Sequence, residues 1–102
     1  MKTTEVELFT LTSGMTLDDI LEIVSNALGP EPNVPSAIVA RFQVGKRFFD
    51  LWAISSRTRL DLRLQSTNAT LGQCLYDPEY VVKDVGPKRV AEELRKLARK
   101  VS

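Results

Sequence analysis

At 102 residues the chain can build one modest hydrophobic core and is too short for two domains that each have a core of their own. Its 14 Lys and Arg residues against 13 Asp and Glu residues give a net charge of +1, so charge-driven binding must depend on a local cluster. Cys74 is the one cysteine, which excludes an intramolecular disulfide and a multi-cysteine zinc site. The sequence has no histidine, the commonest metal ligand.

The same features bear on location. A lone cysteine mildly favours a reducing compartment. The longest apolar runs are far shorter than a membrane span, and the first residues lack the apolar core of a signal peptide. We therefore expect a cytoplasmic protein that has no membrane partner.

Two elements are predicted before residue 30. Alternation over residues 5–12 predicts a strand at a sheet edge. Thr16 followed by Asp19 resembles a capping box and predicts the start of a helix, which Gly29 and Pro30 end. One face of this helix carries an apolar stripe made of Leu17, Ile20, Leu21, Val24, Ala27 and Leu28. The range 29–36 contains three prolines and is the predicted linker to the next strand.

Residues 37–55 form two alternating runs joined by Gly45-Lys46 and predict a hairpin with a type II′ turn, since Gly45 can adopt a positive φ. This turn fixes the pairing of the two strands. The predicted core-facing pairs are Val44 with Arg47, Phe42 with Phe49, Ala40 with Leu51, and Ile38 with Ala53. On the opposite face, Arg41 is expected beside Asp50.

A third strand is predicted over residues 59–65, where three leucines alternate with polar residues. A turn at Ser56-Arg57 would place Asp50 between Arg41 and Arg63. It would also extend the apolar face through the pairs Ala53 with Leu60, Leu51 with Leu62, and Phe49 with Leu64.

The last third of the chain is less regular. Residues 77–85 could open a helix at Asp-Pro-Glu, or form a strand that pairs with residues 74–76, and the β-branched Val81, Val82 and Val85 favour the strand. Gly86-Pro87 predicts a final helix. Its expected buried stripe is Val90, Leu94, Leu97, Ala98 and Val101, and its expected ion pairs are Arg89 with Glu93 and Glu92 with Lys96.

This order of elements predicts a single α+β domain over residues 1–102. Short connections favour antiparallel pairing, so we expect an antiparallel sheet of four to five strands with two helices packed on one face, in the order β-α-β-β-β-(β)-α. The face without helices should be largely solvated. It would carry Arg41, Gln43, Phe48, Asp50, Trp52, Arg59, Asp61, Arg63 and Gln65.

No residue set specifies a catalytic activity, a cofactor or a resident metal. Phe48 and Trp52 are apolar groups on a polar face, and such groups are typical of contact surfaces. The favoured hypothesis is a small non-catalytic binding or regulatory module that contacts a protein partner or a second copy of itself. Its predicted contact residues are Phe48, Trp52, Arg41, Arg59 and Arg63.

Two alternatives remain open. Residues 52–102 contain ten basic and six acidic side chains, which allows nucleic-acid binding through the sheet and the last helix. The residues that would act are Arg41, Arg59, Arg63, Lys88, Arg89 and Lys96. The third hypothesis is a metal-dependent phosphodiesterase, because Asp50 and Asp61 would share a face and could hold Mg²⁺, although an ion-paired ladder explains the same residues.

Overall fold

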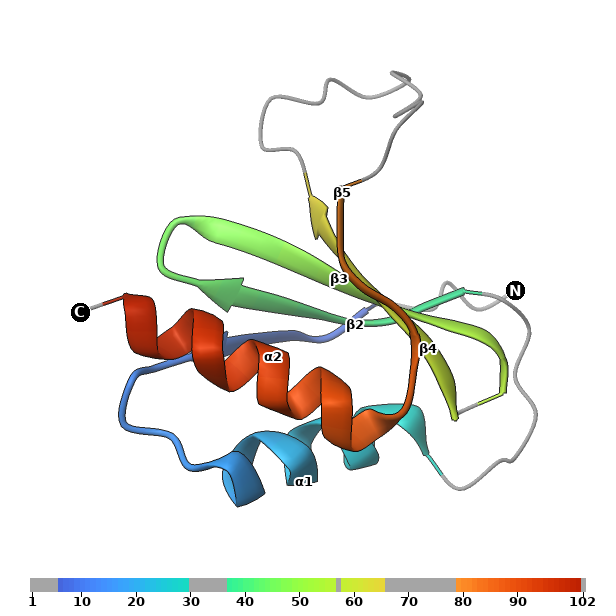
Figure 1. The fold of residues 1–102 in the computed structure, drawn as a ribbon, viewed down its shortest axis with the longest axis horizontal. Helices are drawn as coiled ribbons and strands as arrows, with labels where there is room; N and C mark the ends of the chain where they lie inside the picture. The colour runs from blue at the N-terminus through green and yellow to red at the C-terminus, as the bar shows by residue number, and fades with distance from the viewer. Residues whose placement is uncertain (1–5, 30–36, 57, 66–78, 102) are drawn as a thin grey trace.

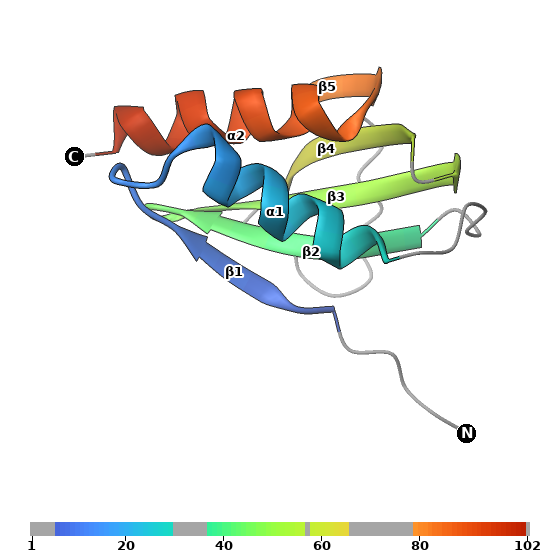
Figure 2. The ribbon, with the colours of Figure 1, turned by 90° about the horizontal axis from the view of Figure 1, so that it is seen from below.

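The computed structural model describes residues 6–29, 37–56, 58–65 and 79–101. Two helices lie side by side on one face of a five-stranded sheet, as Figures 1 and 2 show. The elements in chain order are β1 (Leu8–Leu11), α1 (Leu17–Leu28), β2 (Ala37–Val44), β3 (Arg47–Ser56), β4 (Arg59–Gln65), β5 (Glu79–Val85) and α2 (Pro87–Lys100). The α+β class, the five strands and the element order are those expected from the sequence.

The sheet has the strand order β1-β2-β3-β4-β5 and is mixed. The pairs β2–β3, β3–β4 and β4–β5 are antiparallel, as predicted. The expectation of an entirely antiparallel sheet is wrong for β1, which pairs with β2 in parallel. The reason is the connection, because α1 carries the chain back along the sheet so that β2 begins at the same end as β1.

The β2–β3 hairpin turns at the predicted position. Gly45, the first turn residue, has a φ of +64°. Lys46, the second turn residue, does not have a positive φ, since among the described residues Asp84 is the one non-glycine residue that does. That is the pattern of a type II′ turn. Val44 lies opposite Arg47, Phe42 opposite Phe49 and Ala40 opposite Leu51, as predicted.

The predicted pairing fails beyond Ala40. The register shifts between Ile38 and Ala40, so that Ile38 lies opposite Trp52 and Ala37 opposite Ala53. One extra residue, Val39, forms a β-bulge and packs against the hydrophobic core. Ile38 therefore moves from the predicted core side to the face without helices, and Val39 makes the reverse change.

The pairing of β3 with β4 is confirmed for Ala53 with Leu60, Leu51 with Leu62 and Phe49 with Leu64. The turn itself is displaced. Ser56 belongs to β3 and lies opposite Arg59, so it is not a turn residue as predicted, whereas Arg57 lies outside the described residues. A register shift between Ala53 and Ser56 absorbs the difference.

In the C-terminal third, residues 79–85 form a strand, as their β-branched residues predicted. The suggested partner segment 74–76 lies outside the described residues, as does Cys74. The sequence also predicted the helix starts correctly. Thr16 is the N-cap of α1 and forms a capping box with Asp19, while Gly86 caps α2 with Pro87 in its first turn.

Two details of α2 differ from expectation. Val101 was expected in the buried stripe but is 41% exposed, because α2 ends at Lys100 and Val101 is its C-cap. The side chain of Val101 lies beside Gly45. The Arg89–Glu93 pair is confirmed at 3.1 Å. Lys96 contacts Glu93 at 3.4 Å instead of Glu92.

The core lies between the sheet and the two helices. The sheet supplies Leu11, Ala40, Phe42, Val44, Phe49, Leu51, Ala53, Leu60 and Leu62, and the helices supply Ile20, Val24, Leu28, Val90, Ala91, Leu94 and Ala98. Among the residues described, no helix combines the length and apolar character needed to span a membrane.

Candidate interaction surface on the outer face of the sheet

The outer face is defined here as the side of the sheet opposite α1 and α2 (Figure 2). Strand pairing aligns one residue of each strand in a row across this face, in the order Leu8, Arg41, Asp50, Arg63 and Tyr80. Both ends of the row are exposed apolar side chains, with Leu8 51% and Tyr80 40% accessible. The centre of the row is charged and less accessible.

Arg41 and Asp50 form the predicted cross-strand pair. Arg41 Nε donates to Asp50 Oδ1 at 2.6 Å, and Arg41 Nη2 reaches Asp50 Oδ2 at 3.5 Å. Asp50 is only 9% accessible, although it lies on the outer face. The pair neutralises a charge that would be costly to leave alone at this depth.

Arg63 lies between two aromatic rings. Its guanidinium carbon is 4.4 Å from the centre of the Trp52 ring and 5.0 Å from that of Tyr80, and both are cation–π contacts. Arg63 Nη2 also donates to Asp61 Oδ2 at 3.1 Å. These contacts hold two aromatic side chains from β3 and β5 around one cation from β4.

Asp61 differs from its predicted solvated environment. It is 3% accessible, and its Oδ1 accepts a hydrogen bond of 2.9 Å from the backbone N–H of Asp84. The cause is a register shift between Leu60 and Leu62, where β5 has an extra residue and Asp84 adopts a φ of +57°. Asp61 thus accepts a hydrogen bond from the backbone N–H of the bulged residue, which would otherwise have no partner in the neighbouring strand.

Arg59 is placed apart from this row. It forms a bidentate pair with Asp84, with both Nε and Nη2 at 2.8 Å from the carboxylate oxygens, and both side chains are exposed. The hydrogen bonds from Arg59 lower the pKa of the Asp84 carboxyl below its ordinary value, and the same contact raises the pKa of Arg59.

The predicted contact residues are therefore partly brought together. Trp52, Arg41 and Arg63 share the outer face, and Phe48 lies there opposite Gln43, half-buried. The predicted basic residues of α2, Lys88, Arg89 and Lys96, lie on the helix side of the sheet and form no common surface with Arg41 and Arg63.

Sequence reasoning missed Leu8, Ile38 and Tyr80 as members of this face. Tyr80 could have been found only by pairing β5 with β4, which requires knowing two register shifts, one between Leu60 and Leu62 and one between Leu62 and Arg63. Leu8 depends in the same way on the parallel pairing of β1.

Asp50 and Asp61 share the outer face, but they have separate partners. Asp50 lies opposite Arg63 in β4, whereas Asp61 lies opposite Trp52, and each carboxylate is bound to its own arginine. Within the described ranges, no group of three or more acidic or cysteine residues is arranged to hold a metal ion.

No known protein family, curated protein or solved structure matches this chain.

Proposed function

We propose that this protein is a non-catalytic binding module that associates with a second copy of itself through the outer face. The supporting observation is the Trp52–Arg63–Tyr80 stack on the side of the sheet opposite both helices. Trp, Tyr and Arg are the side chains most enriched among energetically dominant interface residues. Here they are already ordered, which reduces the entropy lost on association.

The charges of this face favour a protein partner over nucleic acid. Arg41 and Arg63 are each bound to a buried carboxylate, so neither is free to neutralise phosphate without breaking an internal pair. Arg63 also occupies one face of both aromatic rings, where a base would have to stack. An aromatic surface whose arginines are bound to internal carboxylates suits a protein contact.

The distribution of the exposed apolar groups favours self-association. A twofold axis parallel to β3 would lay β1 of one copy over β5 of the other, because these strands are the two edges of the sheet. Leu8 of each copy would then face Tyr80 of its partner. The two most exposed apolar side chains of the row would bury each other at both ends of the interface.

Analytical ultracentrifugation over a wide range of protein concentration tests this proposal. We expect the wild type to be dimeric at high concentration and Tyr80→Glu and Leu8→Glu to be monomeric, because a carboxylate would be buried without a partner. Asn26→Glu, an exposed substitution on α1, is the matched control and should dimerise normally. Thermal unfolding followed by circular dichroism verifies that each variant is folded.

A wild type that stays monomeric at every concentration would overturn the proposal. So would an equal loss of dimer in Asn26→Glu, since that residue lies on the helix side of the molecule. Nucleic-acid binding stays a separate prediction, which a titration with an oligonucleotide at low and moderate salt decides.

A further inference from the structure

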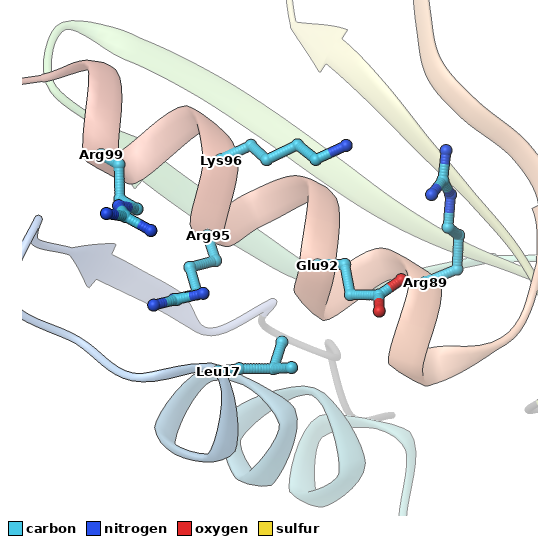
Figure 3. Close-up of a pocket in the computed structure, with 6 residues that line it drawn as sticks. All are labelled: Leu17, Arg89, Glu92, Arg95, Lys96 and Arg99. Carbon is cyan, nitrogen blue, oxygen red and sulfur yellow. The ribbon is translucent and has the colours of Figure 1, made fainter.

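A second surface, independent of the proposed self-association, lies on the helix side of the sheet. A pocket of about 310 Å³ opens along α2 beside the beginning of α1 (Figure 3). Its volume is at the lower end of the range for small-molecule sites. Four of its six lining residues are cationic; the lining consists of Leu17, Arg89, Glu92, Arg95, Lys96 and Arg99.

The four cations are not equivalent. Arg89 and Lys96 both contact Glu93, at 3.1 and 3.4 Å. Arg95 and Arg99 form no ion pair with any residue that the structure describes. They are four residues apart on one helix, a spacing at which like charges repel each other.

The guanidinium of Arg95 is partly enclosed by the protein. Its Nε is buried and has no hydrogen-bond partner among the described residues. A buried donor without a partner is unfavourable, and native proteins rarely leave one. The dipole of α2 favours Arg99, which lies in the last helical turn, but it provides no acceptor for Arg95 Nε.

The side chains also separate by direction. Figure 3 shows Arg95 and Arg99 extending toward the side of α2 where Leu17 lies, whereas the carboxylate of Glu92 points toward Arg89. Leu17 is the first residue of α1, so the positive end of that helix dipole adjoins the two arginines. The carboxylate of Asp19 in the same turn is engaged by the backbone N–H of Thr16 at 3.0 Å.

We propose that this pocket binds the phosphate group of a small phosphorylated ligand, with Arg95 and Arg99 as its two principal donors. The Nε and Nη groups of a guanidinium form a fork that fits two oxygens of one oxyanion. A phosphate in this position accepts from the Nη groups of the two arginines, separates the two like charges and leaves Glu92 at the far end of the pocket. Leu17 supplies an apolar wall against the remainder of the ligand.

Inorganic pyrophosphate is the probe that tests the site, with binding measured by calorimetry and by the Nε–Hε signals of arginine in NMR spectra. We expect the Nε–Hε signal of Arg95 to shift on titration. Arg95→Gln and Arg99→Gln should each weaken binding at least about tenfold, because each removes a charge-assisted hydrogen bond. Glu92→Gln should strengthen binding, since it removes the negative charge of the pocket.

Lys100→Gln is the matched control, because it removes the same charge from an exposed position of α2 that does not line the pocket. It should leave pyrophosphate affinity within about twofold of the wild type at moderate salt, where exposed charges are screened. Equal losses in Lys100→Gln and Arg95→Gln would overturn the proposal in favour of a diffuse basic surface.

An oligonucleotide provides the second arm of the experiment. Binding of single-stranded RNA with no response to pyrophosphate would overturn the small-ligand site and support a nucleic-acid surface on α2 instead. Absence of any Arg95 shift with pyrophosphate at low salt would also overturn it.

Discussion

Among the side chains of the outer face, Asp61 joins the largest number of structural features. Its carboxylate binds the backbone N–H of Asp84 at 2.9 Å and the guanidinium of Arg63 at 3.1 Å, and it is almost fully buried. One carboxylate thus joins the β5 bulge to the cation that holds Trp52 and Tyr80. Its role in the fold and its role in the proposed interface depend on the same two contacts.

Replacing Asp61 should therefore lower the free energy of unfolding, and the loss should grow with the number of contacts removed. We expect Asp61→Ala to lower the free energy of unfolding by about 3 kcal/mol, because it leaves a partly buried backbone donor and a partly buried cation without this carboxylate partner. Asp61→Asn keeps an acceptor for the Asp84 N–H and should cost about 1–2 kcal/mol. Urea denaturation measures both, with the exposed Asp18→Ala as a control expected within about 0.5 kcal/mol of the wild type. Equal effects of Asp61→Ala and Asp18→Ala would contradict this role.

The sequence predicted the positions of residues that interact with near neighbours in the chain, but not those of residues whose partners are distant in sequence. Thr16 with Asp19 and Gly45 with its turn are local, and their geometry follows from residue type and spacing. The Arg41–Asp50 pair was also predictable, because it follows from the turn by counting along two strands. The burial of Asp61 was not, because it depends on the conformation of Asp84, 23 residues further along the chain.

At the scale of the elements, bulges explain most of the differences between expectation and structure. Strict alternation placed Ile38 in the core and Val39 outside, and one extra residue in β2 reversed both. Periodicity does not reveal such a bulge when both residues are β-branched and apolar, since either can be buried. The parallel position of β1 has a different cause, because the pairing direction depends on where the crossover through α1 returns the chain.

The bulge in β5 leads to a prediction about pH. Asp84 is held by Arg59, which lowers the pKa of its carboxyl below the ordinary value of 3.8. A carboxyl whose pKa is lower in the folded state stabilises the protein above its unfolded pKa, and this stabilisation is lost as the pH falls through the folded pKa. The unfolding free energy should therefore decline below about pH 4, more steeply in the wild type than in Asp84→Asn.

Asparagine is the suitable replacement because it also tolerates the left-handed backbone conformation that Asp84 adopts, at a φ of +57°. Denaturation curves between pH 3 and about pH 7, together with NMR titration of the Asp84 carboxyl, measure the effect. Identical pH dependence in the two proteins would show that the Arg59 contact contributes nothing to stability. High salt should reduce the difference, because both side chains are exposed.

At the scale of the whole molecule, the sheet separates two surfaces of different chemistry. The outer face has aromatic side chains and internally paired charges, whereas the α2 pocket has two arginines without ion-pair partners in the described part of the chain. Between them lies a layer of fully buried side chains that includes Phe42, Leu51 and Leu62. Close packing of this layer keeps the two sides in fixed positions, and none of the described residues that form it is titratable.

The two proposed activities should therefore be independent. Substitutions that are far apart and share no partner have additive effects on free energy. We expect Tyr80→Glu to abolish self-association while leaving pyrophosphate affinity unchanged, and Arg95→Gln to weaken pyrophosphate binding while leaving the dimer intact. The double variant should show both losses at their separate magnitudes, measured by ultracentrifugation and calorimetry on the same samples. A change in dimer affinity on adding saturating pyrophosphate would contradict this independence and indicate coupling between the two faces. Linkage requires that dimerisation would then change the affinity for pyrophosphate by the same factor.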